Sequence, residues 1–120
     1  MEIIGLIEAF ESTKDRINIT YEQFKEDTKD FEITPVYYKN EVIGAMLVKE
    51  NHVHACIKPQ YKGKWFGRVA LRVISKIIEE YGEAITSATT EDGRKIVESL
   101  GFIKDGDVYR STKKWALKQY

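Results

Sequence analysis

The chain has 120 residues, and its 19 basic and 19 acidic side chains give a formal net charge of zero. This length fits one domain, and a content of 42% hydrophobic and 32% charged residues argues against global disorder. The neutral total disfavours a domain that is basic overall and binds nucleic acid, and the single cysteine, Cys56, excludes an intramolecular disulfide. No apolar run approaches the roughly 18 residues that a membrane helix needs, so we expect a cytoplasmic protein without membrane contact.

The first third of the chain predicts two helices. Residues 2–11 carry apolar side chains at helical spacing, namely Ile3, Leu6, Ile7 and Phe10. Residues 18–29 predict a second helix. Thr20 can cap this helix, and Gln23, three residues later, would complete a capping box.

The middle of the chain predicts an antiparallel meander of three strands. Residues 35–39 are rich in Val and Tyr, and residues 42–50 return after a tight turn at Asn40-Glu41. Residues 53–58 form the third strand, which Pro59 ends.

The remaining residues predict a crossover followed by a hairpin. Apolar residues recur along 66–81 with the spacing of a long amphipathic helix, which Gly82 ends. A strand at 84–89, a helix at 91–100 and a hairpin of residues 102–104 and 108–112 follow. This order predicts an α+β fold, with a mixed, mostly antiparallel sheet, a central βαβ crossover and helices on both faces of the sheet.

Charge is distributed unevenly along the chain. Residues 1–50 contain six basic and eleven acidic side chains, a net charge of −5, whereas residues 58–76 contain six basic side chains and no acidic one. The basic segment follows a strand and leads into a helix, and Gly63 and Gly67 allow close approach of a ligand. This pattern indicates a phosphate-binding turn, although the two common nucleotide motifs are absent and a solvated basic helix face explains the charges equally well.

Three motifs occur in one order along residues 35–113. The central one, Gln60-Tyr61-Lys62-Gly63-Lys64-Trp65, follows Ile57-Lys58-Pro59 at the end of a strand. The second, Tyr38-Lys39-Asn40-Glu41-Val42-Ile43-Gly44, precedes it, and the third, Glu98-Ser99-Leu100-Gly101-Phe102, follows it. Together they resemble the GNAT superfamily of acyl-CoA-dependent N-acetyltransferases, of which this chain would be a short, divergent member forming a single domain over residues 1–120, with the first family strand missing.

The resemblance implies that acetyl-CoA is the co-substrate and that an unidentified primary amine attacks its thioester directly in a ternary complex. The strands at 53–58 and 84–89 would run parallel and splay apart, and the pantetheine arm would pair with the backbone of Ala55, Cys56 and Ile57. The pyrophosphate would bind the turn and the helix start. The implied cofactor-binding residues in this region are Gln60, Lys62, Gly63, Lys64, Trp65, Gly67 and Arg68, and Thr90 replaces an asparagine frequent in the family.

Three residues are candidates for proton transfer. His54 can accept the proton of the amine, because a neutral imidazole suits that task near pH 7, and Glu50 can act as a base through water. Tyr109 can serve as the acid, since Val97 stands where the family often has a catalytic tyrosine. Each has a structural alternative: a satisfied strand histidine, a solvated strand end and an aromatic residue packed on the sheet. The sequence predicts no metal site, because His52 and His54 lack a third ligand.

Several departures from the family keep other functions open. Trp65 replaces a small residue of the loop pattern, and together with Val97 it motivates a non-catalytic interaction protein that binds coenzyme A weakly or not at all. Nucleic acid is the least favoured partner, since the chain is neutral overall. The missing first strand would leave an exposed sheet edge, through which the chain could form a homodimer.

Overall fold

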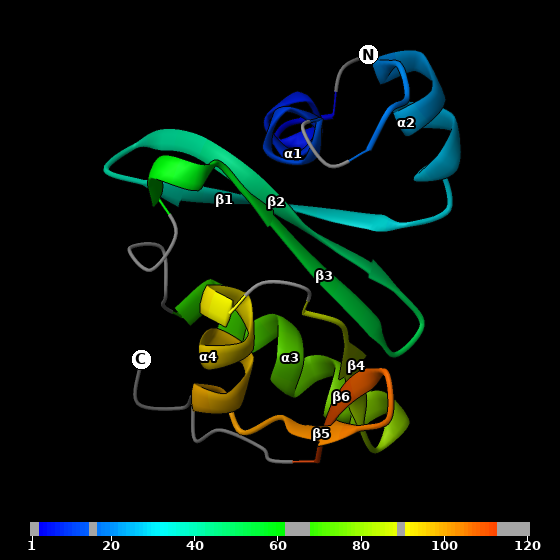
Figure 1. Ribbon diagram of the computed structural model, residues 1–120, viewed down its shortest axis with the longest axis vertical. Helices are drawn as coiled ribbons and strands as arrows, with labels where there is room; N and C mark the ends of the chain where they lie inside the picture. The colour runs from blue at the N-terminus through cyan, green and yellow to red at the C-terminus, as the bar shows by residue number, and fades with distance from the viewer. Residues whose placement is uncertain (1–2, 15–16, 62–67, 89–90, 113–120) are drawn as a thin grey trace. The chain divides into compact units, whose positions relative to one another are not determined.

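The computed structural model describes residues 3–14, 17–61, 68–88 and 91–112, which form an α+β fold of four α-helices, a short 3₁₀ helix and six strands (Figure 1). The strands follow the order β1-β2-β3-β4-β6-β5 in one mixed sheet. Most pairs are antiparallel, and β3 and β4 run parallel. The predicted α+β class and the mixed, mostly antiparallel sheet with one parallel pair are therefore confirmed, whereas helices on both faces of the sheet stay a prediction.

Each predicted helix and strand occurs, with shifted ends. The first half of the chain contains α1 (Leu6–Thr13), α2 (Tyr21–Asp27), β1 (Glu32–Tyr38), β2 (Glu41–Lys49) and β3 (His52–Ile57). The second half contains η1 (Pro59–Tyr61), α3 (Arg68–Tyr81), β4 (Ala84–Thr86), α4 (Glu91–Ser99), β5 (Ile103–Asp105) and β6 (Val108–Ser111).

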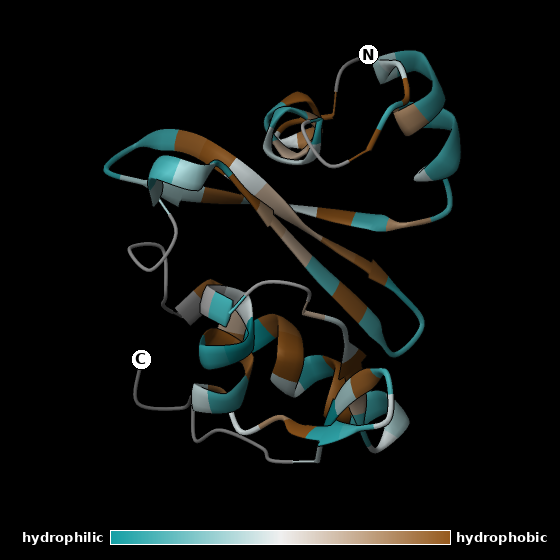
Figure 2. Cartoon of the chain, viewed as in Figure 1, coloured by the Kyte–Doolittle hydropathy of each residue, from teal (hydrophilic) through white to brown (hydrophobic). Residues whose placement is uncertain are grey.

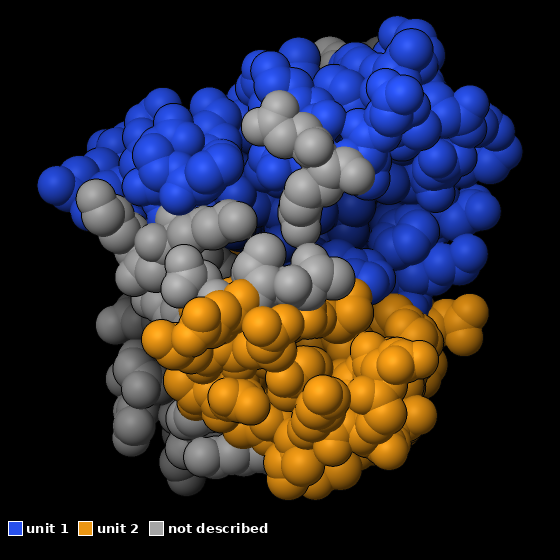
Figure 3. Space-filling model, viewed as in Figure 1, with its two compact units in different colours: residues 1–49, 54–65 blue, residues 50–53, 66–120 orange. Residues whose placement is uncertain are grey.

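The chain divides into two compact units (Figure 3). Unit 1 consists of Met1–Lys49 and His54–Trp65, and unit 2 consists of Glu50–Val53 and Phe66–Tyr120. None of the helices in the described residues is long and apolar enough to span a membrane.

Unit 1 buries the apolar side of two helices on a strand hairpin. α1 packs on β2 and on α2, and its Phe10 ring lies 5.5 Å from that of Tyr21 and 5.4 Å from that of Phe24. The buried residues of this core are Leu6, Ala9, Phe24, Ala45 and Leu47. As predicted, Thr20 caps α2, and its hydroxyl accepts from the Gln23 N–H at 3.1 Å. The Gln23 side chain instead donates to Asp27 at 2.7 Å, so only half of the predicted capping box forms.

The β1–β2 hairpin turns one residue earlier than predicted. Tyr38 pairs with Glu41, and Lys39 and Asn40 form the turn with φ values of 50° and 69°. Two successive positive φ values match the right-handed twist of the flanking strands. The register shifts between Val36 and Tyr37, so Ile43 is the extra residue of a bulge on β2.

The backbones of β2 and β3 approach each other closely at Gly44. A Cβ atom on Gly44 would lie 2.1 Å from the Cys56 carbonyl oxygen and 2.9 Å from the Ile57 Cα. No side chain fits in that space, which explains glycine at this position. Beside it, the Lys58 N–H donates to the Ile43 carbonyl at 2.9 Å and extends the contact beyond the end of β3.

Unit 2 is organised around α3, whose apolar stripe is visible in Figure 2. Its central residues Ala70, Ile74, Ile77 and Ile78 are buried, as the spacing predicts. Val69 and Tyr81, which lie further toward the two ends of the stripe, are 37% and 48% exposed. The core is completed by Ala84 and Ile85 of β4 together with Leu100, Phe102 and Tyr109.

The end of α4 explains the motif Glu98-Ser99-Leu100-Gly101-Phe102. Gly101 has a φ of 92°, its N–H donates to Glu98 at 3.0 Å, and the Phe102 N–H donates to Val97 at 3.0 Å. These two bonds form a Schellman motif, in which glycine takes the left-handed position and the next apolar residue, here Phe102, packs inside.

The parallel connection between β3 and β4 is short. His52 lies opposite Ile85, and the Ile85 N–H donates to the Asn51 carbonyl at 2.8 Å. β4 then pairs with β6 along its whole length, from Ala84 opposite Ser111 to Thr86 opposite Tyr109.

The predicted sheet edge corresponds to β1, which stands at one end of the strand order. Pro35 lies in the middle of this strand and has no N–H to offer to a further strand. Formation of a homodimer through this edge stays a prediction.

Candidate functional site

β3 carries the residues expected to hold the pantetheine arm, and they differ in exposure. Ala55 is exposed, although Val53 and Ile57 on the same side of the strand are buried. Cys56 is half-buried and packs against the core of unit 1, as expected of a cysteine that acts as a small apolar residue. Ala55 is therefore a solvent-exposed residue between two buried ones on this side of β3.

The chain leaves β3 through η1, which contains Gln60. Pro59, Gln60 and Tyr61 form one short turn, closed by a hydrogen bond of 2.9 Å from the Tyr61 N–H to the Lys58 carbonyl. Gln60 is exposed. The end of β3 is thus a structured segment up to Tyr61, directly before the predicted phosphate-binding turn.

Tyr61 is held by the β1–β2 hairpin. Its hydroxyl donates to the Glu41 carboxylate at 2.7 Å, and its ring lies 5.5 Å from that of Tyr38. The hydrogen bond to Glu41 is the main reason why the pKa of Tyr61 is raised above its ordinary value of 10.0, with smaller contributions from desolvation and from the negative charge of Glu41. Sequence reasoning missed this contact because the two residues are 20 positions apart and no periodic pattern links them.

Several predicted cofactor-binding residues lie outside the described part of the chain: Lys62, Gly63, Lys64, Trp65, Gly67 and Thr90. Arg68 is described as the first residue of α3, and its side chain is not. Further along α3, Arg72 and Lys76 are exposed, as expected for cations on the polar face of the helix.

His54 lies beside an aromatic ring in unit 1. It is half-buried, and its imidazole lies 6.4 Å from the Phe31 ring, over which the Lys49 ammonium is placed at 5.7 Å. His52, two residues earlier on β3, is exposed. A half-buried imidazole on a strand is compatible with both interpretations of His54, the base and the packed strand residue.

The sequence predicts Glu50 at the end of a strand, but this residue lies in the turn between β2 and β3. β2 ends at Lys49, and Glu50 adopts a left-handed conformation with a φ of 55°. Its side chain is exposed. The tight turn places this carboxylate in solvent instead of on the sheet.

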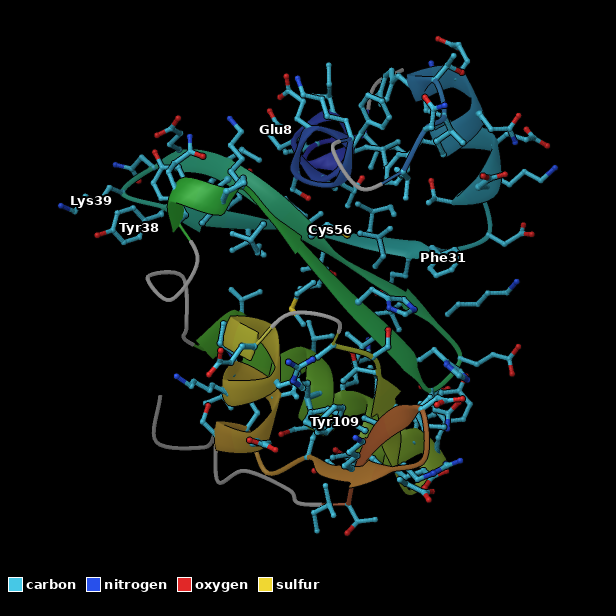
Figure 4. All side chains as sticks on the ribbon, viewed as in Figure 1. Glu8, Phe31, Tyr38, Lys39, Cys56 and Tyr109 are labelled. Carbon is cyan, nitrogen blue, oxygen red and sulfur yellow. The ribbon has the colours of Figure 1, made fainter. Side chains whose placement is uncertain are left out.

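Tyr109 is a buried residue of β6, with 4% of its surface exposed. Figure 4 labels its side chain. In the sheet, Tyr109 lies opposite Thr86 of β4 and Lys104 of β5. Because directly opposite residues of antiparallel strands share one face, the Tyr109 and Thr86 side chains lie on the same face of the sheet. Tyr109 is therefore packed on the sheet, and its role as the acid stays a prediction.

Comparison of the chain with models of protein families, with curated proteins and with solved structures found no match. Among the residues that the structure describes, no group of three His, Cys, Asp or Glu side chains is arranged to hold a metal ion.

Proposed function

We propose that this protein is an N-acetyltransferase similar to the GNAT superfamily, which transfers the acetyl group of acetyl-CoA to a primary amine. The amine attacks the thioester carbonyl, and the thiolate of coenzyme A leaves. The protein aligns the two substrates, offers backbone N–H groups to the developing oxyanion and supplies a path for the proton of the amine.

The observation that supports this proposal most directly is the parallel pair of β3 and β4, joined by a crossover through α3. This arrangement is the one that the resemblance implies for residues 53–89. Six basic side chains and no acidic one occupy the segment from Lys58 to Lys76, which begins directly after β3 and includes most of α3. Cations and free N–H groups at a helix start favour a phosphate ligand.

The proposed binding residues extend along one segment of the chain. The backbone of Ala55 to Ile57 pairs with the pantetheine arm, and the exposure of Ala55 supports access of a ligand to this strand. Gln60 and the turn that follows hold the pyrophosphate. The remaining residues proposed for coenzyme A are Lys62, Gly63, Lys64, Trp65, Gly67, Arg68 and Thr90.

The proposed proton path uses His54 and Tyr109. His54 takes the proton of the attacking amine, since a half-buried imidazole can be neutral near pH 7. Tyr109 returns a proton to the leaving thiolate, which requires its buried hydroxyl to face the ligand. Glu50 is the weaker candidate for the base, because it lies exposed in a turn.

The release of free thiol from acetyl-CoA in the presence of primary amines tests this proposal. We expect thiol release that depends on the amine and on the protein, and that falls at least tenfold in His54→Gln. Exposed His52→Gln is the matched control and keeps the rate. Absence of amine-dependent release across small amines, polyamines and lysine peptides would contradict the enzymatic function.

A non-catalytic protein with the same fold is the second candidate, and the burial of Tyr109 favours it, because a packed aromatic does not need a catalytic role. Trp65 also favours it by standing where the family pattern has a small residue. Gain of coenzyme A binding in Trp65→Gly, with no binding by the unaltered chain, would support this candidate and reject the enzyme.

A further inference from the structure

We infer that Tyr38, Glu41 and Tyr61 form a clasp that positions the end of β3 for coenzyme A. The inference rests on the function proposed above and names residues that the resemblance assigns no role. All three belong to unit 1, so the clasp lies within one compact unit. We call these three residues the hairpin clasp.

The hairpin clasp joins two segments that are distant in sequence. Glu41 begins β2 directly after the Lys39–Asn40 turn, and Tyr38 ends β1 opposite Glu41. From the other segment, Tyr61 ends η1, and its hydroxyl donates to Glu41 at 2.7 Å while its ring lies 5.5 Å from that of Tyr38. Figure 4 shows Tyr38 and Lys39 at the tip of the hairpin, and Figure 1 shows η1 beside that tip.

The hairpin clasp continues a series of contacts along the β2–β3 seam. Gly44 lets the Cys56 carbonyl approach β2, and the Lys58 N–H donates to Ile43 one step further along. The Tyr61–Glu41 bond is the last contact of this series. Without it, the contacts that remain at Tyr61 among those described here are the backbone bond inside η1 and the Tyr38 ring. Binding of a ligand that pairs with the backbone of residues 55–61 would then have to order this segment. The lost conformational entropy would weaken the affinity.

The charges around the hairpin clasp make its bond dependent on protonation. Glu41 and Tyr38 face Tyr61, and the Lys39 ammonium lies 5.4 Å from the centre of the Tyr38 ring. The Glu41 hydrogen bond and charge raise the pKa of Tyr61, so the folded chain favours the neutral phenol. The contact needs the neutral phenol, so it is lost as the pH rises through the raised pKa of Tyr61.

Calorimetric titration with coenzyme A tests the inference on Glu41→Gln and Tyr61→Phe. We expect each variant to raise the Kd about fivefold, and the double variant to be no worse than either single one, because both remove the same hydrogen bond. The matched controls are Glu32→Gln and Tyr37→Phe, exposed residues of β1 outside the clasp, which keep the Kd of the unaltered chain.

Two further readouts do not need coenzyme A. The phenolate absorbance of Tyr61, obtained by subtracting the Tyr61→Phe spectrum, appears at lower pH in Glu41→Gln than in the unaltered chain. The amide N–H groups of Lys58 and Tyr61 exchange about fivefold faster in Glu41→Gln.

The possible results separate the two proposals. Equal affinity of the unaltered chain and both variants for coenzyme A would overturn the positioning role of the hairpin clasp and leave the proposed function standing. An unaltered chain that does not bind coenzyme A, with the Tyr61 titration still dependent on Glu41, overturns the proposed function and with it the positioning role. A Tyr61 titration that is independent of Glu41 overturns the clasp, whatever coenzyme A does.

Discussion

The two compact units hold their strands together in different ways. In unit 1, β1 and β2 have 7 and 9 residues, and the sheet is fixed by backbone approach at Gly44 and by the hairpin clasp. In unit 2, β4, β5 and β6 have only 3, 3 and 4 residues, and the 14-residue helix α3 contributes more buried apolar residues to the core than any other element. Unit 1 therefore depends on close backbone geometry, whereas unit 2 depends on burial of one helix stripe.

This difference determines which substitutions each unit tolerates. A small added atom is costly where two backbones meet, and a removed side chain is costly where a helix supplies the core. The residues proposed for coenzyme A are divided between the units in the chain, since Ala55 to Gln60 belong to unit 1 and Arg68 belongs to unit 2.

Gly44→Ala is the substitution with the largest expected effect. Its added methyl group would meet the Cys56 carbonyl at 2.1 Å, and we expect a loss of more than about 3 kcal/mol in the free energy of unfolding, measured by urea denaturation. The control is Gly106→Ala, where nothing lies within 4 Å and only the φ of 64° opposes the change, at a cost of about 1 kcal/mol. Equal losses in the two variants would show that the close approach of the backbones at Gly44 is not what makes this substitution costly.

Ile74→Ala tests the dependence of unit 2 on the α3 stripe. Ile74 is 2% exposed, and its truncation should cost about 2–3 kcal/mol in the same denaturation experiment. Val69→Ala, on the same helix at 37% exposure, should cost less than about 1 kcal/mol. If both variants lose the same stability, α3 is not the core of unit 2.

Thr20→Ala removes a local contact of unit 1 and leaves its sheet unchanged. The lost cap of α2 should cost about 1 kcal/mol, whereas Asn18→Ala, an exposed residue before the cap, should cost almost nothing. A Thr20→Ala loss as large as that of Gly44→Ala would show that helix ends, not backbone approach, dominate unit 1.

Arg110→Gln has the smallest expected effect and tests a surface contact of unit 2. The Arg110 guanidinium donates to Asp105 at 2.6 Å and to Glu83 at 2.8 Å, and the Asp105 hydrogen bond is the main reason why its pKa is raised. We expect a small decrease in the thermal midpoint at low salt that shrinks at high salt, since the Asp105 pair is exposed and the Glu83 pair is only partly buried. If the decrease in the thermal midpoint does not depend on salt, the effect of Arg110 comes from packing and not from its ion pairs.

Sequence patterns predicted the elements of both units because apolar periodicity is local. The α3 stripe gave unit 2 its main helix, and the alternation and turn residues gave unit 1 its meander. The hairpin turn was misplaced by one residue, since Asn40 can occupy either position of a two-residue turn with positive φ.

The candidate site was less accessible to sequence reasoning. The Tyr61–Glu41 bond and the Gly44–Cys56 approach join residues that only the fold brings together. The sequence predicts Glu50 as the last residue of the strand at 42–50, yet its left-handed φ of 55° places it in the turn into β3. The motif at residues 98–102 is accounted for by the Schellman end of α4, so its weight for the family resemblance is smaller than its letters indicate.

Calorimetric titration of the chain with coenzyme A and acetyl-CoA tests the central claim most directly. The account predicts micromolar binding of both, abolished in Gly63→Glu, because a carboxylate would repel the pyrophosphate, and retained in Asn18→Glu, which adds the same charge at an exposed residue before α2. No binding at millimolar coenzyme A, or equal binding by the two variants, would contradict it.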